Sequence, residues 1–177
     1  MARRTLAGTA TVSGTGLHTG AKTTVQVGPG EAGSGIRFQR TDLPGQPLVA
    51  ARVAQVEATE RRTGLADGGA AVQTVEHLLG ALFAEQIDDA LITIDGPEPP
   101  ILDGSFQPWI EAIDRAGVKE LEGDPVVIRV TAPFTVEEGD ARYVVAPASN
   151  FQVTGTIEWN HPVIGRQPLS VTMTPAS

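Results

Sequence analysis

The residues with the clearest potential for chemistry are Glu76 and His77, in the run Thr74-Val75-Glu76-His77. A neutral imidazole beside a carboxylate can bind a metal ion while the carboxylate serves as a general base. Apolar residues recur around this pair with the spacing of a buried helical stripe: Val75, Leu78, Leu79, Leu82 and Phe83. At 100° per residue, His77 lies almost opposite the stripe, so we expect its ring to face solvent or another element. The alternative is an ordinary polar first turn, because the two-histidine spacing of zinc-binding helices is absent from the sequence.

A second candidate is His18, which lies within the glycine-rich run from Gly14 to Gly20. Three glycines in seven residues predict a tight turn, and glycine lets the backbone approach a ligand such as a phosphate closely. The simpler interpretation is a hairpin turn with no further role.

Two other segments contain polar residues of possible interest. The run Asp95–Ser105 contains three prolines and predicts a stiff, extended connector with a structural role, although Asp103 could serve a site. His161 lies in Trp159-Asn160-His161-Pro162 and is a single loop histidine without a supporting motif.

The elements that position these residues are two helices and several short strands. The first helix begins near Thr74. The second is predicted over Phe106–Ala116, with Ser105 as its N-cap, Pro108 in its first turn and Gly117 as its C-terminal cap.

Short β-branched runs with period-two alternation predict antiparallel strands and hairpins. These runs are Thr9–Ser13, Thr23–Val27, Ile36–Gln39, Leu91–Ile94, Val126–Val130, Tyr143–Ala146, Gln152–Trp159 and Leu169–Thr174. Together with the two helices they predict an α+β fold, in which a mostly antiparallel sheet carries both helices on one face.

A weak internal repeat predicts a second, similar domain. The prolines at 29 and 44 match those at 147 and 162 with one offset of 118 residues. We therefore expect a first domain at 1–124 and the opening strands of a second at 125–177. Because its helices would fall beyond the last residue, we expect the chain to be an N-terminal portion of a longer protein.

Composition excludes several function classes. Thirteen Lys and Arg against twenty-one Asp and Glu give a formal charge of −8, which disfavours nucleic-acid and anionic-membrane partners. There is no cysteine, and no apolar run approaches the roughly 20 residues of a membrane span. The N-terminal residues lack the apolar segment of a secretory signal, so we expect a cytoplasmic location.

In combination, the motifs resemble those of the UDP-3-O-acyl-N-acetylglucosamine deacetylases, zinc hydrolases of lipid A biosynthesis. The matching motifs are Gly14–Gly20, Arg40–Leu43, Thr74–Leu78, Gly96–Ser105 and Asn160–Pro162, in the order and at the spacing of the family. The resemblance implies two similar α+β domains and an active site between them.

The resemblance also implies roles for individual residues. His77 would be one ligand of a catalytic Zn²⁺, and Glu76 the general base for hydrolysis of the acetamide. His18, His161 and Thr63 would contact the UDP-linked acylated substrate. The family's other zinc ligands, a His and an Asp, have no counterpart here. Glu60–Thr63 also carries charges where the family has mostly apolar residues.

Two other interpretations remain at the level of the sequence. One is a stand-alone, non-catalytic module of the same ancestry that binds a sugar nucleotide or a protein partner. The other is a different metal hydrolase that uses His18, His77 and His161 together.

Overall fold

The computed structural model describes residues 2–174 and has the α+β architecture predicted from the sequence. The chain divides into two compact units, Met1–Pro125 and Val126–Ser177. No helix in the described part of the chain is long and apolar enough to cross a membrane.

The first unit contains both α-helices and most of the strands. The helices are α1 (Glu76–Ala84) and α2 (Gln107–Ala116), and a short 3-10 turn, η1, spans Val53–Gln55. The strands are β1 (Arg3–Leu6), β2 (Ala10–Thr15), β3 (Lys22–Pro29), β4 (Ile36–Arg40), β5 (Leu48–Ala50), β6 (Val56–Ala58), β7 (Gly64–Asp67), β8 (Ala70–Val72), β9 (Ala90–Ile94) and β10 (Val118–Leu121).

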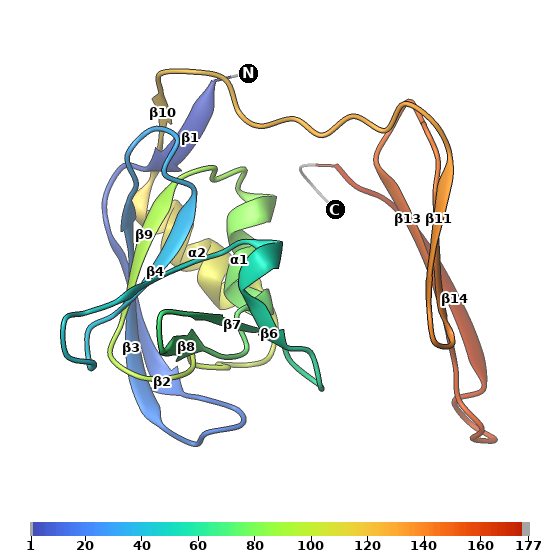
Figure 1. Cartoon of the computed structure of the whole chain (residues 1–177), viewed down its shortest axis with the longest axis horizontal. Helices are drawn as coiled ribbons and strands as arrows, with labels where there is room; N and C mark the ends of the chain where they lie inside the picture. Colours follow the sequence, from blue (N-terminus) through green and yellow to red (C-terminus); the bar gives the residue numbers. More distant parts are fainter. Residues whose placement is uncertain (1, 175–177) are drawn as a thin grey trace. The chain divides into compact units, whose positions relative to one another are not determined.

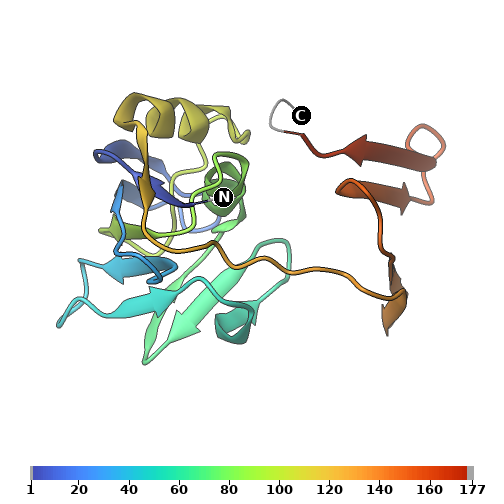
Figure 2. The same ribbon diagram turned by 90° about the horizontal axis from the view of Figure 1, so that it is seen from above.

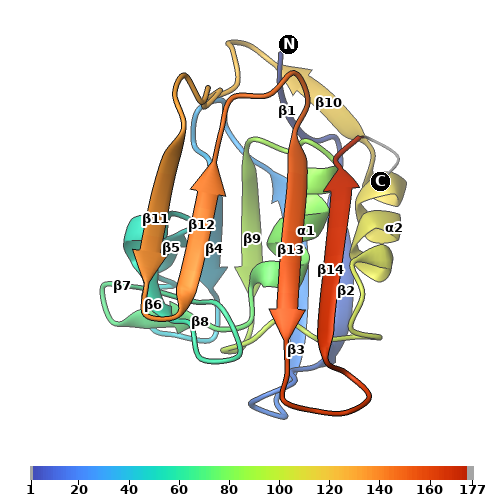
Figure 3. The same ribbon diagram turned by 90° about the vertical axis from the view of Figure 1, so that its right-hand side faces the viewer.

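The main sheet has the strand order β2-β3-β9-β4-β5 and is antiparallel except where β9 runs parallel to β4 (Figure 3). The alternation predicted for β3 is confirmed. Thr23, Val25 and Val27 are buried, whereas Thr24 and Gln26 are not. This period-two pattern places one face of the sheet in the core.

Both helices lie on that face of the sheet and pack against each other (Figure 1 and Figure 2). The core contains apolar side chains of the sheet and of both helices, including Val27 and Ile92 of the sheet, Leu82 of α1 and Trp109 of α2. Burying this sheet face against the two helices is the main source of stability in such a layered domain.

The predicted helices are present, but two details of their apolar stripes are wrong. Phe83 is 66% exposed, because it lies about 100° around the helix from the buried Leu82 and faces away from the sheet. Phe106 precedes α2 and stays 45% exposed. Gly117 is the C-cap of α2, as predicted, with a φ of +74°. The N-cap is Phe106 and not Ser105, although Ser105 Oγ accepts a hydrogen bond from the Gln107 N–H.

Two small sheets of the first unit have no counterpart in the prediction. Strand β1 pairs with β10 and so joins the two ends of the unit, and β6, β7 and β8 form a three-stranded sheet before α1. Their strands are only three or four residues long, which is too short for a clear alternation pattern.

The second unit consists of two antiparallel hairpins in the residues described. Strands β11 (Phe134–Glu138) and β12 (Ala141–Val145) form one, and β13 (Gln152–Glu158) and β14 (Arg166–Thr172) form the other. The strand predicted over Val126–Val130 is wrong. Its residues have β propensity but no partner strand, and a strand needs a neighbour for its backbone hydrogen bonds.

Candidate functional site

The start of α1 is joined to the segment before β7 through Thr63. The Thr63 N–H donates a hydrogen bond of 3.0 Å to Glu76 Oε2, and the Thr63 carbonyl accepts one of 3.2 Å from the Val75 N–H. The fold therefore brings Thr63 and Glu76, two of the candidate residues, into direct contact. No other hydrogen bond to the Glu76 carboxylate occurs within residues 2–174, so its second oxygen is free to act on a ligand.

His77 is half-buried and contacts another element, as its helical position predicts. Its ring meets Phe106 edge-on, with 5.8 Å between the ring centroids and 82° between the planes. The Nδ1 atom of His77 is buried and has no hydrogen-bond partner among the described residues. An unpaired buried nitrogen is unfavourable, so this atom is suited to a ligand that supplies the missing interaction.

Gly80 allows Phe106 to lie beside His77. A Cβ atom at position 80 would come within 2.9 Å of the Phe106 ring, closer than van der Waals contact permits. The missing side chain one turn after His77 thus creates the space that the aromatic ring occupies.

His18 lies in the turn between β2 and β3, and its side chain is exposed. The predicted hairpin turn is present, and His18 is exposed on it. The backbone N–H of His18 donates to both oxygens of Glu98 at 3.1 Å. Thr19 donates to Glu98 Oε2 from its N–H and from its hydroxyl, each at 2.8 Å.

Glu98 is the residue that the sequence analysis missed. Its side chain is fully buried, and Thr74 Oγ1 donates to its Oε1 at 2.6 Å. Burial alone would raise the pKa of Glu98, but the hydrogen bonds from Thr74, Thr19 and His18 together hold it below the usual value. The position of this acidic residue between Pro97 and Pro99 was the available signal.

Asp103, the residue singled out in the same connector, has a local role. It is exposed and accepts hydrogen bonds from the N–H and the hydroxyl of Ser105, at 2.9 Å and 2.8 Å. These bonds lower the pKa of Asp103 and orient Ser105 toward α2.

His161 belongs to the second unit and is engaged within its own loop. Its Nδ1 accepts hydrogen bonds from the N–H groups of Val163 and Ile164, at 3.2 Å and 3.3 Å. Such a turn-stabilising role leaves Nε2 as the nitrogen available for another contact.

A complete metal site is not present in the described residues. Within 2–174, no group of three or more His, Asp or Glu side chains is placed to hold a metal ion. His77 can supply one ligand, whereas a catalytic zinc site needs about three from protein. Of the three histidines in the alternative metal-hydrolase hypothesis, His18 and His77 belong to the first unit and His161 to the second.

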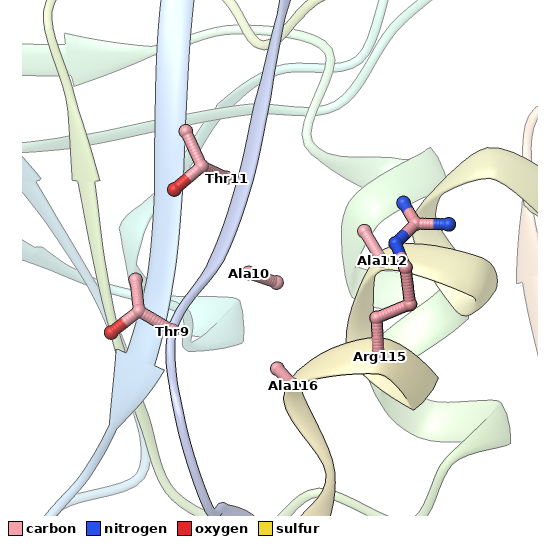
Figure 4. A pocket seen from close by; sticks show the side chains of 6 residues that line it. All are labelled: Thr9, Ala10, Thr11, Ala112, Arg115 and Ala116. Atoms are coloured by element: carbon pink, nitrogen blue, oxygen red, sulfur yellow. The ribbon is translucent and has the colours of Figure 1, made fainter.

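A small hollow elsewhere on the first unit contains none of the candidate residues. It has a volume of about 120 Å³ and lies between the start of β2 and the end of α2 (Figure 4). Its lining residues are Thr9, Ala10, Thr11, Ala112, Arg115 and Ala116. The candidate site is thus defined by the start of α1 and by the β2–β3 turn, and not by this hollow.

Comparison with known proteins agrees with the motifs. Residues 3–177 match the family described as UDP-3-O-acyl N-acetylglycosamine deacetylase. A UDP-3-O-acyl-N-acetylglucosamine deacetylase of Thermosynechococcus vestitus is 45% identical over 170 residues, which cover 96% of this chain and 60% of that protein.

Two further relatives carry the same name. That of Geotalea uraniireducens is 41% identical over 93% of this chain and 54% of its own length, and that of Trichormus variabilis is 40% identical over 100% and 64%. The chain thus spans between about half and two thirds of the length of these curated relatives. Because the family match extends over nearly every residue, this chain belongs to the UDP-3-O-acyl N-acetylglycosamine deacetylase family.

Proposed function

We propose that this chain carries part of the active site of a zinc-dependent hydrolase that removes the N-acetyl group from UDP-3-O-acyl-N-acetylglucosamine in lipid A biosynthesis. The observation that carries the proposal is the pairing of Glu76 and His77 at the start of α1. One oxygen of the Glu76 carboxylate is held by Thr63, and the buried Nδ1 of His77 has no protein partner in the described residues. Family membership supports the choice of substrate.

In this proposal Glu76 is the general base. The Thr63 N–H fixes Oε2, and the other oxygen takes the proton of the water that attacks the acetamide carbonyl. Cleavage of the C–N bond then releases acetate, and the proton moves to the leaving nitrogen of the sugar. A carboxylate held in one orientation makes this transfer more efficient than a freely rotating one.

His77 supplies one zinc ligand. Zinc, when bound, polarises the carbonyl and lowers the pKa of a bound water. The described residues fit one ligand and not a complete site, so the remaining ligands must come from another segment or another chain. Phe106 restricts the rotation of the His77 ring through its edge-on contact.

His18, Thr63 and His161 are proposed to contact the substrate. His18 is exposed at the β2–β3 turn, where its imidazole can reach a polar group of the nucleotide sugar. Thr63 lies against Glu76, next to the reacting acetamide of the proposal. His161 contributes from the second unit through Nε2.

A second candidate function is a non-catalytic module that binds a sugar nucleotide or a protein partner. The incomplete ligand set within residues 2–174 favours it. The two functions differ in one respect, because only the first requires the carboxylate of Glu76.

The test uses a hybrid in which these 177 residues are followed by the part of the Thermosynechococcus vestitus relative that they do not match. We expect zinc-dependent release of acetate from the UDP-sugar. Glu76→Gln should lower turnover about 10²–10⁴-fold with zinc still bound, which is the loss expected for a general base. His77→Ala should weaken zinc binding.

The matched control is Glu111→Gln, which changes an exposed carboxylate on α2 and should leave turnover unchanged. Undiminished turnover in the Glu76→Gln hybrid would show that Glu76 is not the base. Binding of the UDP-sugar without any hydrolysis would favour the non-catalytic module.

A further inference from the structure

We propose that Glu98 is a positioning residue of the candidate site, whose carboxylate fixes the His18 turn against the residue that leads into Glu76 and His77. The proposal rests on the proposed function in that it treats these residues as parts of one active site. The geometry that supports it and the experiment that tests it do not depend on that function. Glu98 acts through Thr74 and through the turn, and it has no direct contact with the substrate.

The two oxygens of the carboxylate serve different elements. Oε2 accepts the N–H and the hydroxyl of Thr19, each at 2.8 Å, and Oε1 accepts the hydroxyl of Thr74 at 2.6 Å. The His18 N–H, at 3.1 Å, is shared between them. Within residues 2–174, no hydrogen bond joins residues 16–20 directly to residues 74–77, so Glu98 is the hydrogen-bonded link between them.

The backbone conformation at Thr74 and in the His18 turn depends on the link through Glu98. Thr74 has a φ of +53°, which is unfavourable for a β-branched residue and persists only when surrounding contacts enforce it. Gly16 is buried, and a Cβ atom at that position would collide with Glu98 Oε2 and Thr19 Oγ1. The turn thus approaches the carboxylate as closely as glycine allows.

Main-chain contacts hold Glu98 in place independently of its carboxylate. The Thr23 hydroxyl donates to the Glu98 carbonyl at 2.8 Å, and the Gln73 N–H donates to the Pro97 carbonyl at 2.8 Å. The Ile101 N–H donates to the Thr15 carbonyl at 3.0 Å. Removing the carboxylate should therefore leave the connector in position and affect mainly the groups that it binds.

The partners of the Glu98 side chain are all neutral donors. A fully buried carboxylate without a cation has to be stabilised by hydrogen bonds, and here they also keep the pKa of Glu98 below its usual value. A glutamine has the same shape but only one acceptor oxygen. Its amide group can still donate to the hydroxyl of Thr74, so Glu98→Gln should retain part of the arrangement.

The experiment measures amide hydrogen exchange by NMR in the 177-residue chain. Glu98→Ala should speed exchange at the His18 and Thr19 amides about tenfold or more, since their acceptor is gone, and should change the amide shifts of Glu76 and His77. Glu98→Gln should have a smaller effect. Glu31→Ala, which removes an exposed carboxylate, is the matched control and should change neither.

Transmission through Glu98 is tested with Thr74→Val, which keeps the β-branched shape and removes the hydroxyl. We expect faster exchange at the His18 amide, although Thr74 makes no hydrogen bond to it. In the Glu98→Ala background the same substitution should add nothing, because the coupling passes through the carboxylate. If Glu98 had only a local structural role, Thr74→Val would not change exchange at the His18 amide.

Equal exchange at His18 and Thr19 in wild-type chain and Glu98→Ala would overturn the proposal, as would an undiminished effect of Thr74→Val in the Glu98→Ala background. If Glu98→Ala does not fold, Glu98→Gln and Thr74→Val decide by the same exchange rates. These rates need no catalysis. An inactive hybrid would therefore count against the proposed function, while the coupling would still be judged on its own.

Discussion

Asp89 and Glu98 are both fully buried carboxylates, and they are stabilised in different ways. Glu98 receives hydrogen bonds from neutral groups, whereas Asp89 binds the Arg3 guanidinium in bidentate fashion, at 2.7 Å and 2.8 Å. The Gly35 N–H also donates to Asp89, at 2.7 Å. Burial alone would raise the pKa of Asp89, but Arg3 and the backbone donors outweigh it and lower the pKa.

Asp89→Asn should destabilise the first unit by about 3 kcal/mol at pH 7, because it leaves the largely buried Arg3 without its charge partner. A lowered folded-state pKa contributes stability that is fully present above the unfolded pKa of about 3.9 and is lost as the pH falls through the folded value. The difference between wild type and variant should thus shrink below about pH 4. Urea unfolding at pH 7, 5 and 3 measures it, with Asp114→Asn, an exposed site, as control. If the difference in unfolding free energy between wild type and Asp89→Asn were independent of pH, the charge of Asp89 would not be its cause.

The contact between His77 and Phe106 should depend on Gly80. Gly80→Ala places a methyl group against the Phe106 ring, which is 45% exposed. The helix gains up to about 1 kcal/mol from alanine, and the lost contact offsets it, so the free energy of unfolding should change by less than about 1 kcal/mol. The imidazole proton shifts of His77 should change, because the ring current of Phe106 is displaced. Unchanged His77 shifts would show that Phe106 does not define its environment.

At the scale of elements, the two units differ in how their strands are covered. In the first unit, β9 pairs with both β3 and β4 and joins two hairpins into one sheet, which α1 and α2 cover. The second unit likewise contains two hairpins that follow one another along the chain. Shifting β3, β4 and β5 by the 118-residue offset of the predicted repeat places them on β12, β13 and β14.

The hairpins of the second unit have an apolar face that remains exposed in this unit. Phe134 and Val136 of β11 lie opposite Val145 and Tyr143 of β12, and three of these four side chains are about half exposed or more. Thr135 and Glu137 occupy the other face. A two-stranded hairpin is at best marginally stable in water without a covering layer.

We therefore expect the segment from Val126 onward to exchange its amide protons faster than the first unit. Limited proteolysis should cut first after about Gly123 and leave a folded N-terminal core. Mass spectrometry of the fragments and hydrogen exchange measure this. Uniform protection along the chain would show that the apolar faces of the hairpins are covered in solution.

At the scale of the whole molecule, the candidate residues are distributed over both units. Glu76, His77, Thr63 and His18 belong to the first unit, and His161 belongs to the second. The chain spans between about half and two thirds of the length of its curated relatives. Within residues 2–174, no group of three or more His, Asp or Glu side chains is placed to hold a metal ion.

The 177-residue chain alone should release no acetate from the UDP-sugar and should bind zinc no more tightly than an isolated histidine does, since one ligand holds the metal weakly. Zinc titration by calorimetry and an acetate assay are the measurements, with His77→Ala as the matched variant. Tight stoichiometric zinc with measurable turnover would contradict this prediction. It would indicate that His18, His161 or a second copy of the chain completes the site.

The sequence by itself determined the elements whose signals are local. Seven of the eight predicted strand runs correspond to strands, with ends displaced by up to three residues, and both helices are present. Alternation and helical spacing are properties of neighbouring residues, so they can be read without knowledge of the fold. The family motifs likewise identified the family, because their order and spacing are written in the chain.

Only the tertiary structure decided which groups meet. The donors to Glu98 come from residues 24 to 80 positions away, Thr63 is 13 residues from Glu76, and neither distance follows from a local pattern. The same limit explains two wrong predictions. Val126–Val130 has strand propensity but no partner strand, and Phe83 was assigned to the apolar stripe of the first helix but faces away from the sheet. Burial and hydrogen-bond satisfaction depend on what lies opposite a residue in space, and that is settled by packing between elements distant in the chain.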